Sequence, residues 1–82
     1  MRLPRDLSGE ELAQLLRLYR YEITRQTGSH LRLTSKFKGA EHHVTIPAHM
    51  SLKVGTLSAI LADVAAYLEV DRDTLAEALF AK

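Results

Sequence analysis

The sequence predicts an α+β fold in the order α-β-β-β-α: a three-stranded antiparallel sheet with helices packed on one face, plus a short extra C-terminal helix. Three observations predict this class. An apolar helical stripe stands near the start, alternating apolar and polar residues fill the middle, and helical spacing returns afterwards. The chain has 82 residues, so a single domain over residues 1–82 is expected. Helices that cover one face of the sheet leave the other face open.

The first helix is predicted over residues 9–19. Ser8 followed by Glu11 is typical of a capping box, in which each side chain accepts a hydrogen bond from the other residue's backbone N–H. Apolar side chains then recur at the spacing of one helical face, and they are Leu12, Leu15, Leu16 and Tyr19. This stripe is expected to pack against the sheet.

Three short strands are predicted within "YEITRQT", "HLRLTS" and "HHVTIP". In each of them apolar and polar residues alternate, which is typical of a strand buried on one face. The expected core-facing residues are Tyr21 and Ile23 in the first strand, Leu31 and Leu33 in the second, and Val44 and Ile46 in the third. The expected polar face carries His30, Arg32, Thr34, His43 and Thr45.

The register of both hairpins follows from keeping the apolar faces together. A second hairpin that turns at "KFKG" places Leu33 opposite Val44. For the first hairpin, a three-residue loop, Thr27-Gly28-Ser29, is expected, which leaves Gln26 opposite His30. The third strand is expected to end at Pro47, because proline cannot donate to a ladder.

Helical spacing returns in "LKVGTLSAILADVAAYL" and continues in "DRDTLAEALF". The expected apolar stripe of the second helix is Leu57, Ile60, Leu61, Val64, Ala65 and Leu68. Asp71 is the expected N-cap of a last short helix, whose buried face is predicted to be Leu75, Ala78 and Leu79.

Charge is distributed unevenly. Residues 17–53 carry seven basic and two acidic residues, an excess of +5, whereas residues 54–82 carry two basic and five acidic residues, an excess of −3. A basic face favours a polyanionic partner, the alternative being a solvated mixed-charge surface. The absence of cysteine excludes disulfides and thiol nucleophiles. No segment approaches about 18 consecutive apolar residues or resembles a signal peptide, so a cytoplasmic protein without a membrane span is expected.

His30 directly follows a Gly-Ser turn and opens the second strand. Imidazole suits general acid–base chemistry, since its ordinary pKa of about 6.5 lies near working pH. The alternative is a turn histidine hydrogen-bonded to nearby backbone. His30 is expected to point to the open face. There it would be surrounded by phosphate-binding charge from Arg25, Arg32, Lys36 and Lys38.

No metal site is expected. His42 and His43 are adjacent in a strand, so their side chains point to opposite faces and cannot both bind one ion without a bulge. No acidic residue stands at ligand spacing with them or with His49. Phe37 is the one aromatic residue expected to contact nucleic acid, because Tyr21, Tyr67 and Phe80 are expected to fill the core.

Four motifs appear in order: the helix start "SGEEL", a hairpin with "GSH" before an alternating strand, "VTIPAH" as the third strand, and "GTLSAIL" opening the second helix. In this order they resemble the HicA toxins, also called YcfA-like mRNA interferases, over about residues 7–62. The resemblance implies a double-stranded-RNA-binding-domain-like fold, ribonuclease activity, and a catalytic histidine at the "GSH" position, which is His30. It also implies a HicB antitoxin that binds the toxin and masks this histidine.

Three features depart from the family pattern. The sequence has Arg20-Tyr21 where the family commonly has a glycine-aromatic pair, and Val54 where it often has proline. Residues 63–82 are expected to extend the second helix and add a C-terminal helix. These differences bear on partner contacts and oligomeric state more than on His30.

The expected function is the toxin of a type II toxin–antitoxin pair: a metal-independent endoribonuclease without a cofactor, acting on single-stranded or messenger RNA through His30. The expected RNA contacts are Arg25, Ser29, Arg32, Lys36 and Lys38. A homodimer through the C-terminal helices is a further expectation. Two alternatives stay open at this point: a non-catalytic RNA-binding module on the same fold, and a protein-interaction subunit that assembles through its acidic C-terminal helices.

Overall fold

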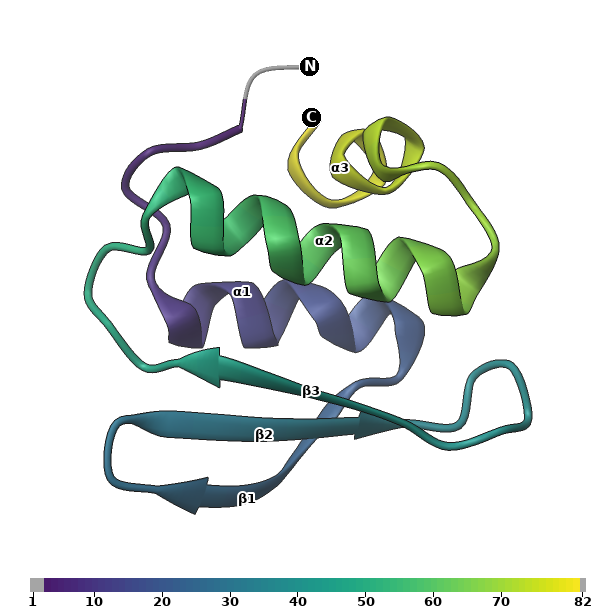
Figure 1. Ribbon diagram of the computed structural model, residues 1–82, viewed down its shortest axis with the longest axis horizontal. Coiled ribbons are helices and arrows are strands. Elements are labelled where there is room, and N and C mark those ends of the chain that lie inside the picture. The colour runs from purple at the N-terminus through teal and green to yellow at the C-terminus, as the bar shows by residue number, and fades with distance from the viewer. Residues whose placement is uncertain (1–2, 82) are drawn as a thin grey trace.

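In the computed structural model, which describes residues 3–81, three strands form an antiparallel sheet with its helices on one side (Figure 1). The strands β1 (Glu22–Thr27), β2 (His30–Ser35) and β3 (His42–Pro47) are neighbours in chain order. The helices are α1 (Gly9–Leu15), continued by the 3-10 helix η1 (Leu16–Tyr19), α2 (Val54–Leu68) and α3 (Arg72–Phe80). The predicted α+β class is confirmed. Lys82, counted in the charge of the acidic tail, lies outside the described residues.

The helices form two levels above the sheet. α1 contacts β2 and β3, and α2 contacts β3, while α3 packs against α2 on its side away from the sheet (Figure 1). The core lies between the sheet and these helices, and it contains the whole predicted stripe of α2, each member of which is buried. The opposite face of the sheet is left open, as the sequence predicts.

Both predicted helix caps are present. Glu11 N–H donates to Ser8 Oγ at 3.0 Å and Ser8 N–H donates to Glu11 Oε1 at 2.9 Å, which completes the capping box. Asp71 Oδ1 accepts from Thr74 N–H at 2.7 Å and starts α3. The buried face of α3 is Leu75, Ala76 and Leu79. The prediction of Ala78 in this face is wrong, because α3 turns the neighbouring small residue, Ala76, toward α2.

The second hairpin has the predicted register. Leu33 lies opposite Val44, and β3 ends at Pro47. The polar faces of the two strands agree as well, since Arg32 lies opposite Thr45. Matching apolar faces were therefore sufficient to define this pairing.

The first hairpin differs from the expectation. Thr27, not Gln26, lies opposite His30, so the loop is the two-residue turn Gly28-Ser29. Gly28 has a φ of 54°, which suits the first central position of such a turn. The apolar faces still match at Ile23 and Leu33, because the register shifts between Ile23 and Arg25. One extra residue in β1 restores the alternation that the longer loop was expected to restore.

β1 is an edge strand whose six residues are all exposed. Tyr21, just before it, is fully buried as predicted, but Ile23 is 49% exposed. The prediction that Ile23 is buried in the core is wrong, because the helices pack against β2 and β3 and leave an open groove between α1 and β1.

Arg20 ends η1 in the left-handed region, with a φ of 64° and a ψ of 26°. Such a backbone costs a non-glycine residue about 1–2 kcal/mol. Arg20→Gly is therefore expected to raise the free energy of unfolding in urea by about 0.5–1 kcal/mol, part of the relief being offset by glycine's greater unfolded-state entropy. Arg17→Gly is the matched control, and it should lower stability because Arg17 lies within η1. Equal losses for both variants would contradict the strain argument.

Candidate functional site

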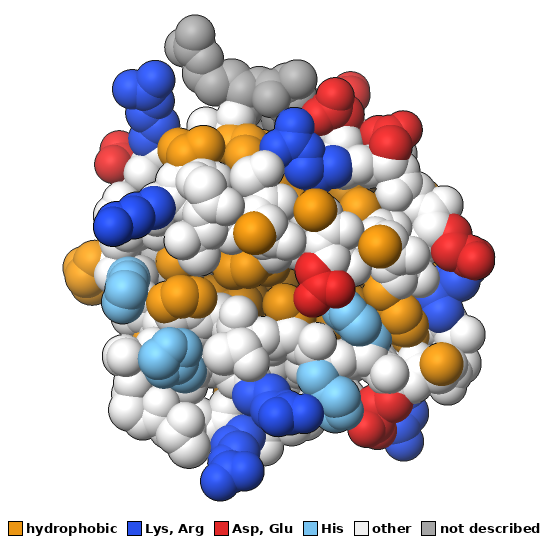
Figure 2. All heavy atoms as spheres, viewed as in Figure 1, with side chains coloured by type: hydrophobic (Ala, Val, Ile, Leu, Met, Phe, Trp, Pro, Cys, Tyr) orange, Lys and Arg blue, Asp and Glu red, His pale blue; other side chains and the backbone are white. Residues whose placement is uncertain are grey.

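The open face of the sheet carries the predicted polar residues. Leu31 and Leu33 are buried beneath the helices, so the alternating residues His30 and Arg32 point the other way and are exposed. Thr34, His43 and Thr45 share this face through the β2–β3 register. Figure 2 shows histidine side chains exposed over the strands, with basic side chains projecting from the sheet below them.

His30 is the first residue of β2 and follows the tight Gly28-Ser29 turn. Its Cα partners are Thr27 on β1 and Pro47 on β3, so it stands at one end of the sheet between both neighbouring strands. One more backbone bond closes this end, from Ala48 N–H to the Ser29 carbonyl at 2.6 Å. The His30 side chain is therefore exposed, while its backbone lies between β1 and β3.

Arg25 and Arg32 lie directly opposite each other beside His30. Arg32 is two residues along β2 from His30, a Cα separation of about 7 Å in a strand. Like charges placed opposite each other in a sheet are destabilising. Within residues 3–81 neither guanidinium forms an ion pair with a carboxylate. The arrangement is therefore suited to an anion that is not part of the chain.

Lys36 and Lys38 lie beyond the other end of β2, about 20 Å of strand from His30. Lys36 Nζ is 3.8 Å from Glu41, and Lys38 Nζ is 3.0 Å from Glu69 at the end of α2. The expectation that they surround His30 is wrong, because the intervening strand is extended. Ser29, in contrast, lies beside His30 in the turn and is exposed.

His43, on β3, is the second histidine of the open face. Both its ring nitrogens contact a side chain. Its Nδ1 is 2.8 Å from the Thr34 hydroxyl, with which it shares a hydrogen bond, and its Nε2 is 3.0 Å from Glu41 Oε1, an ion pair when the ring is protonated. The Thr34 hydroxyl is also 2.8 Å from that of Thr24. This row is not predicted from the sequence, because Thr24 joins it only through the shifted register of β1.

His42 points to the helix side, as adjacent strand residues must. Its Nε2–H donates to Asp63 Oδ1 at 3.2 Å, and its Nδ1 accepts from the Tyr21 hydroxyl at 2.7 Å in the neutral ring. The ring stacks on Tyr67 with centroids 4.6 Å apart. This cluster joins β3 to α2 and was not predicted, although Asp63 and Tyr67 stand four residues apart on one face of a helix.

Burial raises the pKa of the Tyr21 hydroxyl, and the nearby Tyr67 and Asp63 raise it further. Unfolded tyrosine loses its proton near pH 10, whereas folded Tyr21 keeps it to higher pH, so this contribution to stability is complete below about pH 10 and is lost above it. Tyr21→Phe is therefore expected to show a smaller alkaline decline in urea-unfolding free energy than wild type. Tyr19→Phe leaves the Tyr21 hydroxyl in place and should keep the full decline. A decline in Tyr21→Phe as steep as in wild type would contradict the assignment.

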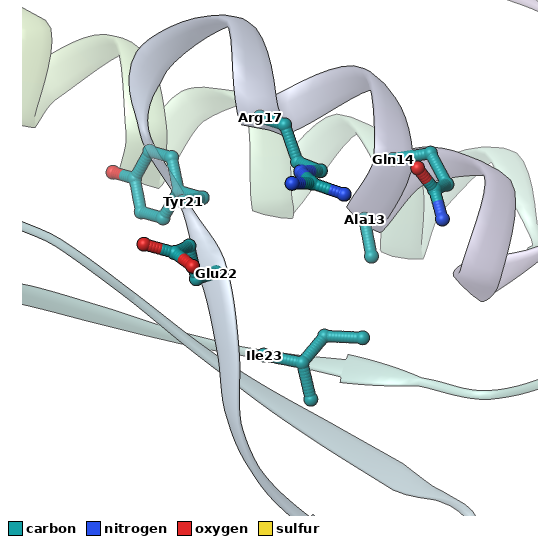
Figure 3. Close-up of a pocket in the computed structure, with 6 residues that line it drawn as sticks. All are labelled: Ala13, Gln14, Arg17, Tyr21, Glu22 and Ile23. Atoms are coloured by element: carbon teal, nitrogen blue, oxygen red, sulfur yellow. The ribbon is translucent and has the colours of Figure 1, made fainter.

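A groove of about 200 Å³ lies between α1 and β1 (Figure 3). Its lining residues are Ala13, Gln14, Arg17, Tyr21, Glu22 and Ile23. In Figure 3 the Ile23 side chain projects into the space beneath α1. This groove is on the helix side of the sheet, whereas His30 is on the open face, so the two are separate features.

In residues 3–81 no three or more His, Asp or Glu side chains gather in a way that could hold a metal ion. No helix in this part of the chain is long and apolar enough to cross a membrane.

Comparison with known proteins adds one finding. The family model described as HicA toxin of bacterial toxin–antitoxin matches residues 9–65, which run from the start of α1 into α2 and contain the whole sheet with His30. No curated protein and no solved structure matches the chain. Since the family model covers more than half of the 82 residues, the chain belongs to the HicA toxin family of bacterial toxin–antitoxin systems.

Proposed function

We propose that this protein, acting as one HicA-like domain, is the toxin of a type II pair and a metal-independent endoribonuclease that cleaves single-stranded or messenger RNA. The observation that carries the proposal is the exposed His30 ring beside the opposed guanidinium groups of Arg25 and Arg32. An RNA phosphate would neutralise that opposed pair and would lie within reach of the imidazole.

The reaction is attack of a ribose 2′-oxygen on the adjacent phosphate, with expulsion of the 5′-oxygen of the next nucleotide. His30 either removes the proton of the 2′-OH or gives a proton to the leaving oxygen. Arg32 would stabilise the negative charge that grows on the phosphorane oxygens, and Arg25 and Ser29 would hold the backbone. Lys36 and Lys38 would contact the same strand farther along. The need for a 2′-OH means that DNA should not be cleaved.

The family implies an antitoxin partner. We propose that this partner is a HicB-type antitoxin, which binds the open face and covers His30. We also propose that the toxin acts in the cytoplasm. The proposed homodimer through the C-terminal helices has less to support it, because α3 buries Leu75, Ala76 and Leu79 against its own chain. A dimer contact there would have to use the outer side of α3.

Induction of wild type and His30→Ala in bacteria tests the proposal. Growth arrest with loss of full-length mRNA is expected for wild type and not for the variant. If neither wild type nor His30→Ala stops growth, although both are soluble and folded, the proposed ribonuclease activity is contradicted. The second candidate, a non-catalytic RNA-binding module, would then be favoured, because the Arg25–Arg32 pair can bind phosphate without any chemistry at His30.

A further inference from the structure

We propose that His49 is a second catalytic residue, which shares the two proton transfers of RNA cleavage with His30. The inference rests on the proposed ribonuclease function and deepens it. Cleavage moves two protons, one away from the 2′-OH and one to the 5′-oxygen, and a single imidazole can serve only one of these roles in a single step. A second proton-transfer group is therefore needed near His30.

The four histidines divide into two kinds by their hydrogen bonds. His42 and His43 each have both ring nitrogens engaged, by Tyr21 and Asp63 and by Thr34 and Glu41. Within residues 3–81 neither the His30 ring nor the His49 ring has a side-chain partner, and both residues are exposed. Only these two imidazoles can exchange a proton with a substrate without first breaking a bond within the described chain.

The two free histidines belong to the same end of the sheet. Pro47 is the Cα partner of His30, and the bond from Ala48 N–H to the Ser29 carbonyl, at 2.6 Å, carries the pairing past the end of β3. His49 follows β3 two residues after Pro47, and a backbone that continued this register would place it diagonally opposite His30, about 7–8 Å away.

The backbone of His49 is held by a second element. The His49 carbonyl accepts from Gly9 N–H, at the start of α1, at 3.0 Å. His49 is thus tied to α1 on one side and, through Ala48, to the turn before His30 on the other. The His49 side chain also lines a hollow with Asp6, Glu10 and Glu11, and the proposal requires its exposed ring to turn from these carboxylates toward a phosphate held by Arg32.

The step balances with these two groups alone. One imidazole, neutral at the start, takes the proton of the 2′-OH as the O2′–P bond forms. The other, protonated at the start, gives its proton to the 5′-oxygen as the P–O5′ bond breaks, leaving a 2′,3′-cyclic phosphate and a free 5′-hydroxyl. Because one ring must be neutral and the other protonated, cleavage by wild type should show a bell-shaped pH profile.

The first test measures single-turnover cleavage of a short RNA by wild type, His49→Ala and the control His43→Gln. His49→Ala is expected to be slower by about 10²-fold or more. It should remain folded, since His49 is exposed and the hydrogen bonds above use only its backbone. His43→Gln replaces a histidine of β3 whose two ring nitrogens already contact Thr34 and Glu41, and it should stay within a few-fold of wild type. Cleavage by His49→Ala at the wild-type rate would overturn the proposal.

The second test separates a proton-transfer role from a merely structural one. A substrate with sulfur in place of the scissile 5′-oxygen needs no proton donor, because a thiolate of pKa near 8.5 leaves unaided. Exactly one of the two variants, His30→Ala or His49→Ala, should then recover most of its lost rate, which also identifies the acid. If neither variant recovers its cleavage rate, or if both do, the proposed acid–base pair of His30 and His49 is wrong.

Failure of the inference can be told apart from failure of the proposed function. If wild type cleaves RNA and His30→Ala does not, while His49→Ala cleaves normally, the ribonuclease stands and the pair is refuted. If wild type cleaves no RNA at all, the ribonuclease itself fails and the pair fails with it. Thermal unfolding of each variant, compared with wild type, excludes loss of fold as the cause of either outcome.

Discussion

Purified His30→Ala protein is expected to cleave RNA about 10²–10⁴-fold more slowly than wild type, the usual contribution of a general acid or base. Its affinity for RNA should change little, because the proposed binding depends mainly on phosphate contacts from the arginines of the open face. The measurement is single-turnover cleavage of a labelled RNA, with Kd for an uncleavable 2′-deoxy analogue determined at several salt concentrations. His30 is exposed at a strand end, so the substitution should leave the fold intact.

Arg25→Ala provides the complementary control. The substitution removes one contact to a phosphate of single-stranded RNA, so it should weaken binding. The slope of log Kd against the logarithm of salt concentration should fall by about 0.7. The two variants thus separate chemistry from binding on one face of the sheet. A His30→Ala protein that loses RNA affinity as well as cleavage would place His30 among the binding residues. Absence of cleavage by both wild type and His30→Ala, with salt-dependent binding intact, would instead favour the non-catalytic module.

Gly9→Ala is expected to lower the free energy of unfolding by about 3 kcal/mol, the upper part of the range for overpacking. Gly9 begins α1 where the helix meets the end of β3, and a Cβ there would overlap the Pro47 carbonyl oxygen and lie 2.9 Å from the Pro47 carbonyl carbon. Those atoms are backbone, so the clash can be relieved only by moving α1 or β3. For a domain of this size the melting temperature should fall by more than about 10 °C.

Gly55→Ala is the matched control for Gly9→Ala. Gly55 lies in the first turn of α2, and nothing would be within 4 Å of an added Cβ. Alanine is the better helix former, so the control should be neutral or stabilising by up to about 1 kcal/mol. If Gly9→Ala proved as stable as Gly55→Ala, α1 would not be held against β3 as closely as described. Because Gly9 also bonds the His49 backbone, any folded Gly9→Ala protein should show altered cleavage as well.

The elements that could be predicted from the sequence are those specified by local or strictly periodic signals. The Ser8–Glu11 capping box and the Asp71 N-cap depend on residues three positions apart. The stripe of α2 and the pairing of β2 with β3 depend on matching one apolar face to another. His30 could be chosen from the sequence because a glycine turn and an alternating strand place it on the open face. Its role in cleavage stays a prediction.

The errors all concern contacts between segments that the local pattern does not specify. The alternating pattern shows that the first hairpin must contain one extra residue if its apolar faces are to match. It does not show the position of that residue, which lies near Thr24 in β1 rather than in the turn. The alternation of its strand predicts that Ile23 is a core residue, yet it is half exposed because a groove separates it from α1. Lys36 and Lys38 are near His30 in sequence but lie a strand's length away in space.

The sequence by itself determined the order of the elements, the open polar face and the exposed histidine at the head of β2, because these follow from residue spacing within single elements. The tertiary structure decided which charges and imidazoles remain available. Glu41 and Glu69 pair with the two lysines, and Glu41 and Thr34 contact His43, while the end of β3 places Pro47 opposite His30. His30 and Pro47, which are 17 positions apart in the chain, become neighbours there only because the strands fold back on one another.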